Sequence, residues 1–149
     1  MGIFNSFDIN ASGMTAQRYR MDIISENVAN INTTRTADGT PYRRKIVVFE
    51  QKPTRPAFKT VFDAQYHRMH EGKGVRVTRV AEDHTSDFVM AFDPAHPDAD
   101  ENGYVHYPNV NVVTEMTNLI DASRAYEANA TAFNTSKAMA LKGLEMAQN

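Results

Sequence analysis

The segment 98–103 has the spacing of acidic and amide side chains that a calcium-binding loop uses. It reads DADENG and matches the first six positions of an EF-hand loop. The twelfth position of such a loop supplies a bidentate glutamate, whereas this chain has Asn109 there, directly after Pro108. Pro94 and Pro97 would also interrupt the helix that enters an EF-hand. We therefore expect a solvated acidic turn and no metal site in this segment.

His67 and His70 are the second pair of side chains that could bind a metal, because a spacing of three places them on one helical turn. No third ligand of suitable type is close in the sequence, and Arg68 and Lys73 add positive charge. The chain has no Cys, which excludes disulfides, thiolate metal sites and a cysteine nucleophile. It also lacks a glycine-rich phosphate loop and a nucleophile elbow. We expect no catalytic residue, no metal and no cofactor, and the chain is not predicted to be an enzyme.

The elements that would position any site begin with a helical pattern near the N-terminus. Apolar residues recur there every seven residues, with further ones three positions later, as in the narrow stripe of a coiled coil. The stripe consists of Phe7, Met14, Met21, Ile24, Val28 and Ile31. A cluster of Asn and Thr residues follows, so the helix is predicted to end between Asn30 and Thr33.

A second and longer helical pattern runs from Val112 to Met146, after Pro108 and with Asn111 as a suitable N-cap. One heptad row is apolar or aromatic in its first four positions, but the partner row includes Ser123 and Ala130. Such a seam lets another helix approach closely while burying little apolar area per turn. This helix is therefore not expected to be stable alone.

The residues between the two helices carry turn and strand signals. Strands are predicted in the segments 46–50, 74–80 and 88–92, which are rich in Val and Phe. Three short strands form only a small β unit. We divide the chain into an N-terminal helix at 1–33, a β-rich middle segment at 34–108 and a C-terminal helix at 109–149. The predicted fold class is mainly α with a small β region.

Composition and charge point to a chain that completes its burial against other chains. Ile, Leu, Val and Phe make up 30 of the 149 residues, a proportion at the border with disorder, while the formal net charge is only -2. Residues 35–79 hold 11 basic and 4 acidic side chains, whereas residues 80–108 hold 7 acidic and no basic ones. These halves either compensate each other within one fold or meet across neighbouring copies. Nucleic acid is not expected as a partner, because the acidic half opposes phosphate.

Several sequence blocks follow one another in an order that is typical of a known protein family. The N-terminal blocks are SGM at 12–14 and RMDIISENVANINT at 20–33, followed by DGTPYR at 38–43 and VVF at 47–49. The later blocks are DPAHPDAD at 93–100, GYV at 103–105, PNVNVVTEM at 108–116 and ASRAYEAN at 122–129. Together these blocks resemble the bacterial flagellar basal-body rod protein family, and within it the proteins of the proximal rod. The resemblance covers nearly the whole chain, with the weakest match from Gln51 to Gly72.

This resemblance implies a structural subunit that polymerises through its terminal helices into the proximal rod, which transmits torque across the periplasm. The two helices would form an antiparallel, coiled-coil-like pair, mobile before assembly and packed as an inner helical layer afterwards. The implied partners are copies of the chain, other rod proteins, basal-body ring or adaptor proteins, and the flagellar type III export apparatus. The opening residues lack a basic region and an apolar run, so no cleaved signal peptide is expected. No segment is apolar enough for membrane insertion.

The residues expected to pack between subunits are the apolar members of both helical stripes. They are Phe7, Met14, Met21, Ile24, Val28 and Ile31 in the first helix, and Val113, Met116, Leu119, Ile120, Tyr126, Phe133 and Leu144 in the second. For each of them, packing inside the chain's own hairpin is the alternative. Asn27, Asn30 and Asn129 are expected to add amide hydrogen bonds between helices.

Two other functions remain open at this point. The chain could be another flagellar axial subunit of the rod or hook. It could also be a binding module that uses the basic stretch from Arg35 to Arg79 on peptidoglycan or a polyanion.

Overall fold

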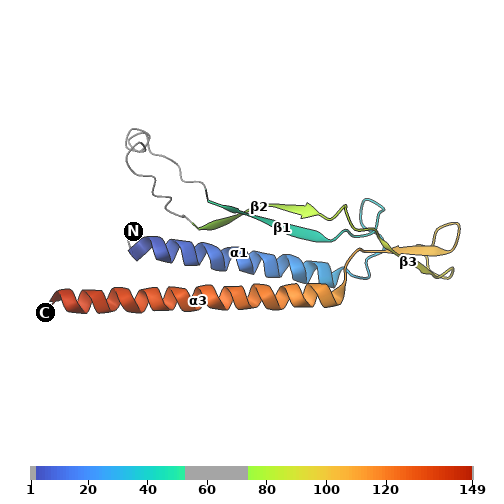
Figure 1. The fold of residues 1–149 in the computed structure, drawn as a ribbon. Coiled ribbons are helices and arrows are strands. Elements are labelled where there is room, and N and C mark those ends of the chain that lie inside the picture. Colours follow the sequence, from blue (N-terminus) through green and yellow to red (C-terminus); the bar gives the residue numbers. More distant parts are fainter. Residues whose placement is uncertain (1–2, 53–73, 149) are drawn as a thin grey trace, which may run out of the picture.

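The chain forms a long antiparallel helical hairpin with a small β region along one side and beyond one end (Figure 1). The computed structural model describes residues 3–52 and 74–148, so His67 and His70 lie outside the described residues. Both termini lie at one end of the hairpin, and the second β sheet extends beyond the other end. The predicted fold class, mainly helical with a small β middle and two paired terminal helices, is confirmed.

The helices in the described part of the chain are α1, Ile3–Ala29, and α3, Val112–Gln148. Asn111 caps α3 as predicted, since its Oδ1 accepts the backbone N–H of Thr114 at 3.2 Å. The rings of Phe7 and Phe133 meet at 5.0 Å between centroids, which sets the register of the pair. From this contact α3 continues further than α1, so its C-terminal end extends roughly 15 Å beyond the start of α1.

Among residues 3–52 and 74–148, the strands form two separate two-stranded antiparallel sheets. Strand β1, Lys45–Gln51, pairs with β2, Val75–Glu82, with a register irregularity between Val48 and Phe49. Both strands pack against α1. Strand β3, Val89–Phe92, pairs with β4, Tyr104–Tyr107, and the second of these strands was not predicted from the sequence.

The core of the single chain is thin, as the low content of large apolar residues indicates. Where the structure describes burial, the buried apolar residues are Ala16, Ile23, Ile24, Tyr42, Val105, Pro108, Val110 and Ala122. Small residues allow close contact between elements: a Cβ on Gly13 would lie 2.7 Å from Oδ1 of Asn129 on the other helix. Gly74, with φ +86°, lets the start of β2 approach Ser12 of α1, whose hydroxyl accepts the N–H of Val75 at 3.1 Å.

Candidate functional site

Asn27 lies at the centre of a buried polar cluster where the end of α1 meets β1 and the start of α3. Its side chain is 1% exposed. Its Nδ2 donates to the carbonyl of Lys45 at 2.9 Å and to Oε2 of Glu115 at 3.0 Å. Its Oδ1 accepts the N–H of Lys45 and the hydroxyl of Tyr42, both at 2.9 Å. One amide therefore ties three elements together with its full hydrogen-bonding capacity.

Glu115 is fully buried and holds the charged part of this cluster. Its Oε1 accepts Nε of Arg44 at 2.8 Å and Nη2 of the same guanidinium at 2.7 Å. The third guanidinium nitrogen, Nη1, lies 3.7 Å from Oδ2 of Asp83. Arg44 thus bridges the Glu115 carboxylate of α3 and the Asp83 carboxylate directly after β2. A buried carboxylate is tolerated only with such partners, so the pair joins α3 firmly to β1.

Asn109 completes the cluster at the entrance to α3. Its Oδ1 accepts the N–H of Arg44 at 2.9 Å, and its Nδ2 donates to the carbonyls of Asp83 and Ser86 at 2.9 and 3.1 Å. The Asp83 carboxylate accepts the N–H groups of Ser86 and Thr85 and the Ser86 hydroxyl, which lowers its pKa. The hydrogen bonds from Asn109 therefore hold the loop after β2 against the segment that precedes α3.

Tyr42 is the member of the cluster with a strongly shifted ionisation. Burial of its hydroxyl, followed by the negative charges of Glu26, Glu115 and Glu82, raises the pKa of Tyr42 to about 12. The hydroxyl therefore stays protonated and donates to Asn27. We define the polar cluster as Asn27, Tyr42, Arg44, Asn109 and Glu115. The hydrogen bonds and ion pairs of these side chains hold α1, β1 and α3 together, so the polar cluster has a structural role.

Sequence reasoning identified Asn27 as an amide between helices, and the structure places it against Glu115 of α3. It missed the other four members of the cluster. An acidic residue in the first turn of a helix is already accounted for by the helix dipole, so Glu115 gave no separate signal. Tyr42 and Asn109 each follow a proline, and they looked like ordinary loop residues.

The other two asparagines expected between helices bond within their own segments. Nδ2 of Asn30 donates to the carbonyl of Glu26 at 2.9 Å. Nδ2 of Asn129 donates to the carbonyl of Ala125 at 2.7 Å, while its amide packs on Gly13 of α1. Asn129 therefore contacts the opposite helix by packing.

The predicted packing residues fall into two groups. In the first group the side chains are buried or half-buried within the single chain. It comprises Phe7, Met14, Met21, Ile24, Val28, Ile31, Leu119 and Phe133. In the second group they are exposed on α3. It comprises Val113, Met116, Ile120, Tyr126 and Leu144.

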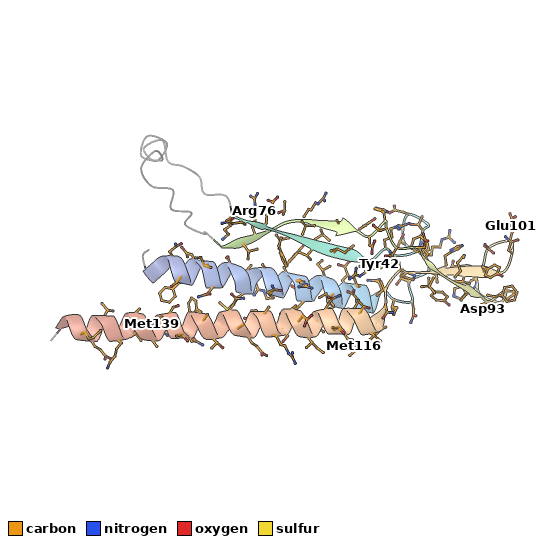
Figure 2. The ribbon with its side chains drawn as sticks, in the orientation of Figure 1. Tyr42, Arg76, Asp93, Glu101, Met116 and Met139 are labelled. Atoms are coloured by element: carbon orange, nitrogen blue, oxygen red, sulfur yellow. The ribbon has the colours of Figure 1, made fainter. Side chains whose placement is uncertain are left out.

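Apart from Tyr126, the large exposed apolar residues of α3 lie toward its two ends, where Figure 2 labels Met116 and Met139. Near the start, Val113, Met116 and Ile120 are three and four residues apart and share one face, with exposed fractions of 75%, 55% and 51%. We call these three residues the outer row. Near the end, exposed apolar side chains lie beyond the start of α1. They are Met139, Leu141, Leu144 and Met146.

Ion pairs join the basic and acidic halves of the middle segment. Besides Arg44 with Asp83, Arg35 lies 3.8 Å from Asp98. Compensation within one fold therefore accounts for part of the charge division, although the exposed Arg35 pair adds little stability. Lys52 and Arg79 form none of the ion pairs found among the described residues.

The acidic segment 98–103 forms a tight turn. Oδ1 of Asp100 accepts the N–H groups of Asn102 and Tyr104 at 2.9 and 2.8 Å, and Gly103 has φ +80°. In the part of the chain that the structure describes, no three side chains of His, Asp or Glu gather closely enough to hold a metal ion. Among the same residues, no helix combines the length and apolar character that a membrane crossing requires.

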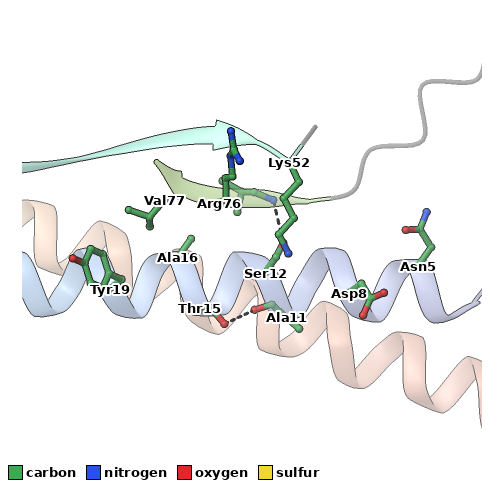
Figure 3. A pocket seen from close by; sticks show the side chains of 11 residues that line it. Asn5, Asp8, Ala11, Ser12, Thr15, Ala16, Tyr19, Lys52, Arg76 and Val77 are labelled. Atoms are coloured by element: carbon green, nitrogen blue, oxygen red, sulfur yellow. Dashed lines mark hydrogen bonds between the residues drawn. The ribbon is translucent and has the colours of Figure 1, made fainter. Parts of the chain in front are cut away.

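A groove of about 870 Å³ lies between the first half of α1 and the sheet of β1 and β2 (Figure 3). Its walls combine apolar side chains, including Ala11, Ala16 and Val77, with the hydroxyl groups of Ser12 and Thr15. Lys52, directly after β1, reaches from the sheet toward the helix. Asp8 lines the groove at the start of α1.

Comparison with known families gives two matches, one at each end of the chain. Residues 7–35 match the family described as "Flagella basal body rod protein". Residues 101–146 match the family described as "Flagellar basal body rod FlgEFG protein C-terminal". The first match covers most of α1, and the second covers β4 and nearly all of α3.

Full-length relatives agree with these matches. The chain is 46% identical over 152 aligned residues to the flagellar basal-body rod protein FlgC of Borreliella burgdorferi, with 99% of each chain covered. It is 42% identical to FlgC of Bacillus subtilis, with 98% of this chain and 99% of the relative covered. It is 40% identical to FlgC of Salmonella typhimurium, with 99% and 100% covered.

Proposed function

The chain belongs to the FlgC family of flagellar basal-body rod proteins, and from that premise we propose that it polymerises through its terminal helices to form part of the proximal rod. In this role it carries torque across the periplasm, with copies of itself, other rod proteins and the ring or adaptor proteins as neighbours. It reaches that place through the flagellar type III export apparatus, without a cleaved signal peptide. The role requires no catalysis.

The outer row of α3 is the observation that carries this proposal. Val113, Met116 and Ile120 point away from the hairpin, and the polar cluster directly beneath fixes the start of α3 to α1 and β1. A contiguous exposed apolar face on a firmly held helix marks an interaction site. A neighbouring helix that covered this face would supply apolar burial that the thin core of the single chain lacks.

The end of α3 supports the same proposal. The exposed residues Met139 to Met146 extend past the start of α1, so α1 does not cover them. A helix segment without a packing partner is marginal in water. We propose that this end becomes ordered when neighbouring subunits cover it, which offsets the conformational entropy lost on assembly.

The test replaces one residue of the outer row and follows incorporation into isolated basal bodies. Ile120→Asp places a charge on the proposed interface, while the 51% exposure of Ile120 means that the fold of the chain is little affected. We expect the variant to be exported but absent from basal bodies, and the cells to lack motility.

Thr114→Asp is the matched control, because Thr114 is also exposed on α3 but lies about 120° around the helix from Ile120. This variant should be incorporated normally. Normal incorporation of Ile120→Asp, with motility retained, would contradict assembly through the outer row. Equal loss of both variants would point to a general intolerance of charge on α3.

A further inference from the structure

The sheet of β3 and β4 presents an uncovered apolar surface at the end of the molecule opposite the termini. Phe92 is 67% exposed, Met90 65% and Tyr104 43%. Phe92 and Tyr104 are directly paired across the strands, and their rings contact edge to face with centroids 5.3 Å apart. Register and alternation place Met90 on the same face. The opposite face contains the fully buried Val105, so the aromatic pair lies on the side that the chain leaves open.

Acidic side chains lie at the outer end of this aromatic surface. Asp93 and Glu101 lie in the turn between the strands, at the outermost end of the molecule (Figure 2). Segment 80–108 contains no Lys or Arg. We call the aromatic pair and these two acids the β3–β4 tip. A partner for the tip must therefore be concave and apolar, and must carry positive charge.

The groove between α1 and the sheet of β1 and β2 has these properties, and it lies toward the other end of the molecule (Figures 1 and 3). Ala11, Ala16, Val75 and Val77 contribute apolar walls. Its volume of about 870 Å³ lies within the range of roughly 300–1,000 Å³ that is typical of binding pockets.

Lys52 supplies the positive charge of the groove. Its backbone N–H donates to the carbonyl of Gly74 at 2.9 Å, which holds the residue at the end of the sheet. Its side chain extends toward α1 and forms none of the ion pairs of the described residues. The other charged side chains that line the groove are Asp8, on the helix side, and Arg76, which is paired with Glu50 at 3.0 Å. Lys52 is thus free to meet an incoming carboxylate.

We propose that the β3–β4 tip of one copy docks into this groove of a second copy, with the rings of Phe92 and Tyr104 against the apolar walls and Glu101 near Lys52. This inference rests on the proposed function, because it names one contact within the polymer. Tip and groove occupy different surfaces of the chain, so the contact is heterologous and repeats from copy to copy.

Because both side chains are already partly covered, the two rings would bury less than the roughly 150–250 Å² each of a fully buried aromatic side chain. This area is too small for a stable interface alone, so the contact adds to the helix packing and fixes the relative shift of neighbouring copies.

Cysteine crosslinking tests the docking directly, since the natural chain contains no Cys. Lys52→Cys and Glu101→Cys are introduced into separate copies, which are produced together in cells that lack the natural chain. Basal bodies are isolated, treated with a short bismaleimide and analysed on denaturing gels. An ion pair between a lysine and a glutamate leaves their Cβ atoms further apart than the roughly 3.5–4.5 Å that a disulfide allows, so the reagent is needed to bridge the two thiols. We expect a band of two chains only when both variants are present.

The control combines Lys52→Cys with Glu127→Cys, which places the second cysteine at an exposed position of α3. This pair should give no two-chain band. Absence of the Lys52–Glu101 band, with both variants present in the basal bodies, would overturn the docking and leave the proposed function standing. A band that joins Lys52→Cys to a different basal-body protein would overturn the choice of a second copy. Absence of the unmodified chain from basal bodies would contradict the proposed function, and the docking with it.

Charge reversal decides the case in which a cysteine variant is not incorporated. Lys52→Glu should lower incorporation several-fold, and adding Glu101→Lys to the same chain should restore it, because the ionic contact is then re-formed with opposite signs. Failure of the double variant to restore incorporation would overturn the docking.

Discussion

Replacing Glu115 by glutamine tests the polar cluster with almost no change of shape. The glutamate accepts two guanidinium N–H groups of Arg44 on Oε1 and one amide N–H of Asn27 on Oε2. A glutamine can offer only one acceptor oxygen, and its amide group donates. Because Asn27 Oδ1 is already occupied by Tyr42 and Lys45, the Asn27 amide cannot turn round to compensate. In either orientation of the glutamine side chain, its NH₂ group would therefore face an N–H donor, from Arg44 in one orientation and from Asn27 in the other.

The magnitude follows from three losses. The bonds to Arg44 change from ionic to neutral acceptors, a loss of about 1 kcal/mol. A buried donor without an acceptor costs roughly 1–3 kcal/mol. Removing an acidic charge from the first turn of α3 costs about 0.5 kcal/mol. We therefore expect Glu115→Gln to lower the free energy of unfolding by about 3 kcal/mol, a large part of the roughly 5–15 kcal/mol of a typical domain.

The assay is urea unfolding of the purified chain, followed by far-ultraviolet circular dichroism. Glu127→Gln is the matched control, because Glu127 is exposed on the same helix and its replacement should change the free energy by less than about 0.5 kcal/mol. Equal, small effects of the two substitutions would show that the cluster does not stabilise the junction, and would refute this reasoning.

Three further predictions concern other parts of the chain. Burial and nearby carboxylates raise the pKa of Tyr42 to about 12, so the contribution of its neutral hydroxyl to the free energy of unfolding is complete below pH 10 and is lost as the pH rises toward 12. Allowing for solvent screening, urea titrations should show that the free energy of unfolding falls by about 1–2 kcal/mol over this range, and Tyr42→Phe should abolish the fall. Gly13→Ala should destabilise the hairpin by about 1 kcal/mol, because the new methyl group would lie 2.7 Å from Oδ1 of Asn129. At most positions inside a helix the same substitution is stabilising, and adding Asn129→Ala should restore that stabilisation in the same titration. Hydrogen exchange of the soluble chain should be slow at 115–123 and fast at 139–146, and the second range should become protected in assembled rods; early protection of 139–146 would contradict ordering on assembly.

The helices could be predicted from the sequence because their signals are local. The seven-residue spacing of Phe7, Met14, Met21 and Val28 marked the first helix, and Asn111 marked the start of the last one. The resemblance to flagellar rod proteins rests on blocks of the same kind, and the comparisons bear it out.

The remaining features depend on contacts between residues distant in the sequence. Strand β4 has only four residues and includes a histidine, so its strand character follows from pairing with β3. The bond between Asn27 and Glu115 spans 88 residues. Periodicity also could not separate Phe133, which packs on Phe7, from Met116, which faces outward on the same helix.

The most direct test of the central claim is a cryo-electron microscopy map of basal bodies isolated from cells that produce this chain. The account predicts density for the chain in the wall of the proximal rod, with α3 among helices of neighbouring subunits and the outer row of Val113, Met116 and Ile120 covered by them. A map that lacked the chain in the rod, or left the outer row facing solvent, would contradict it.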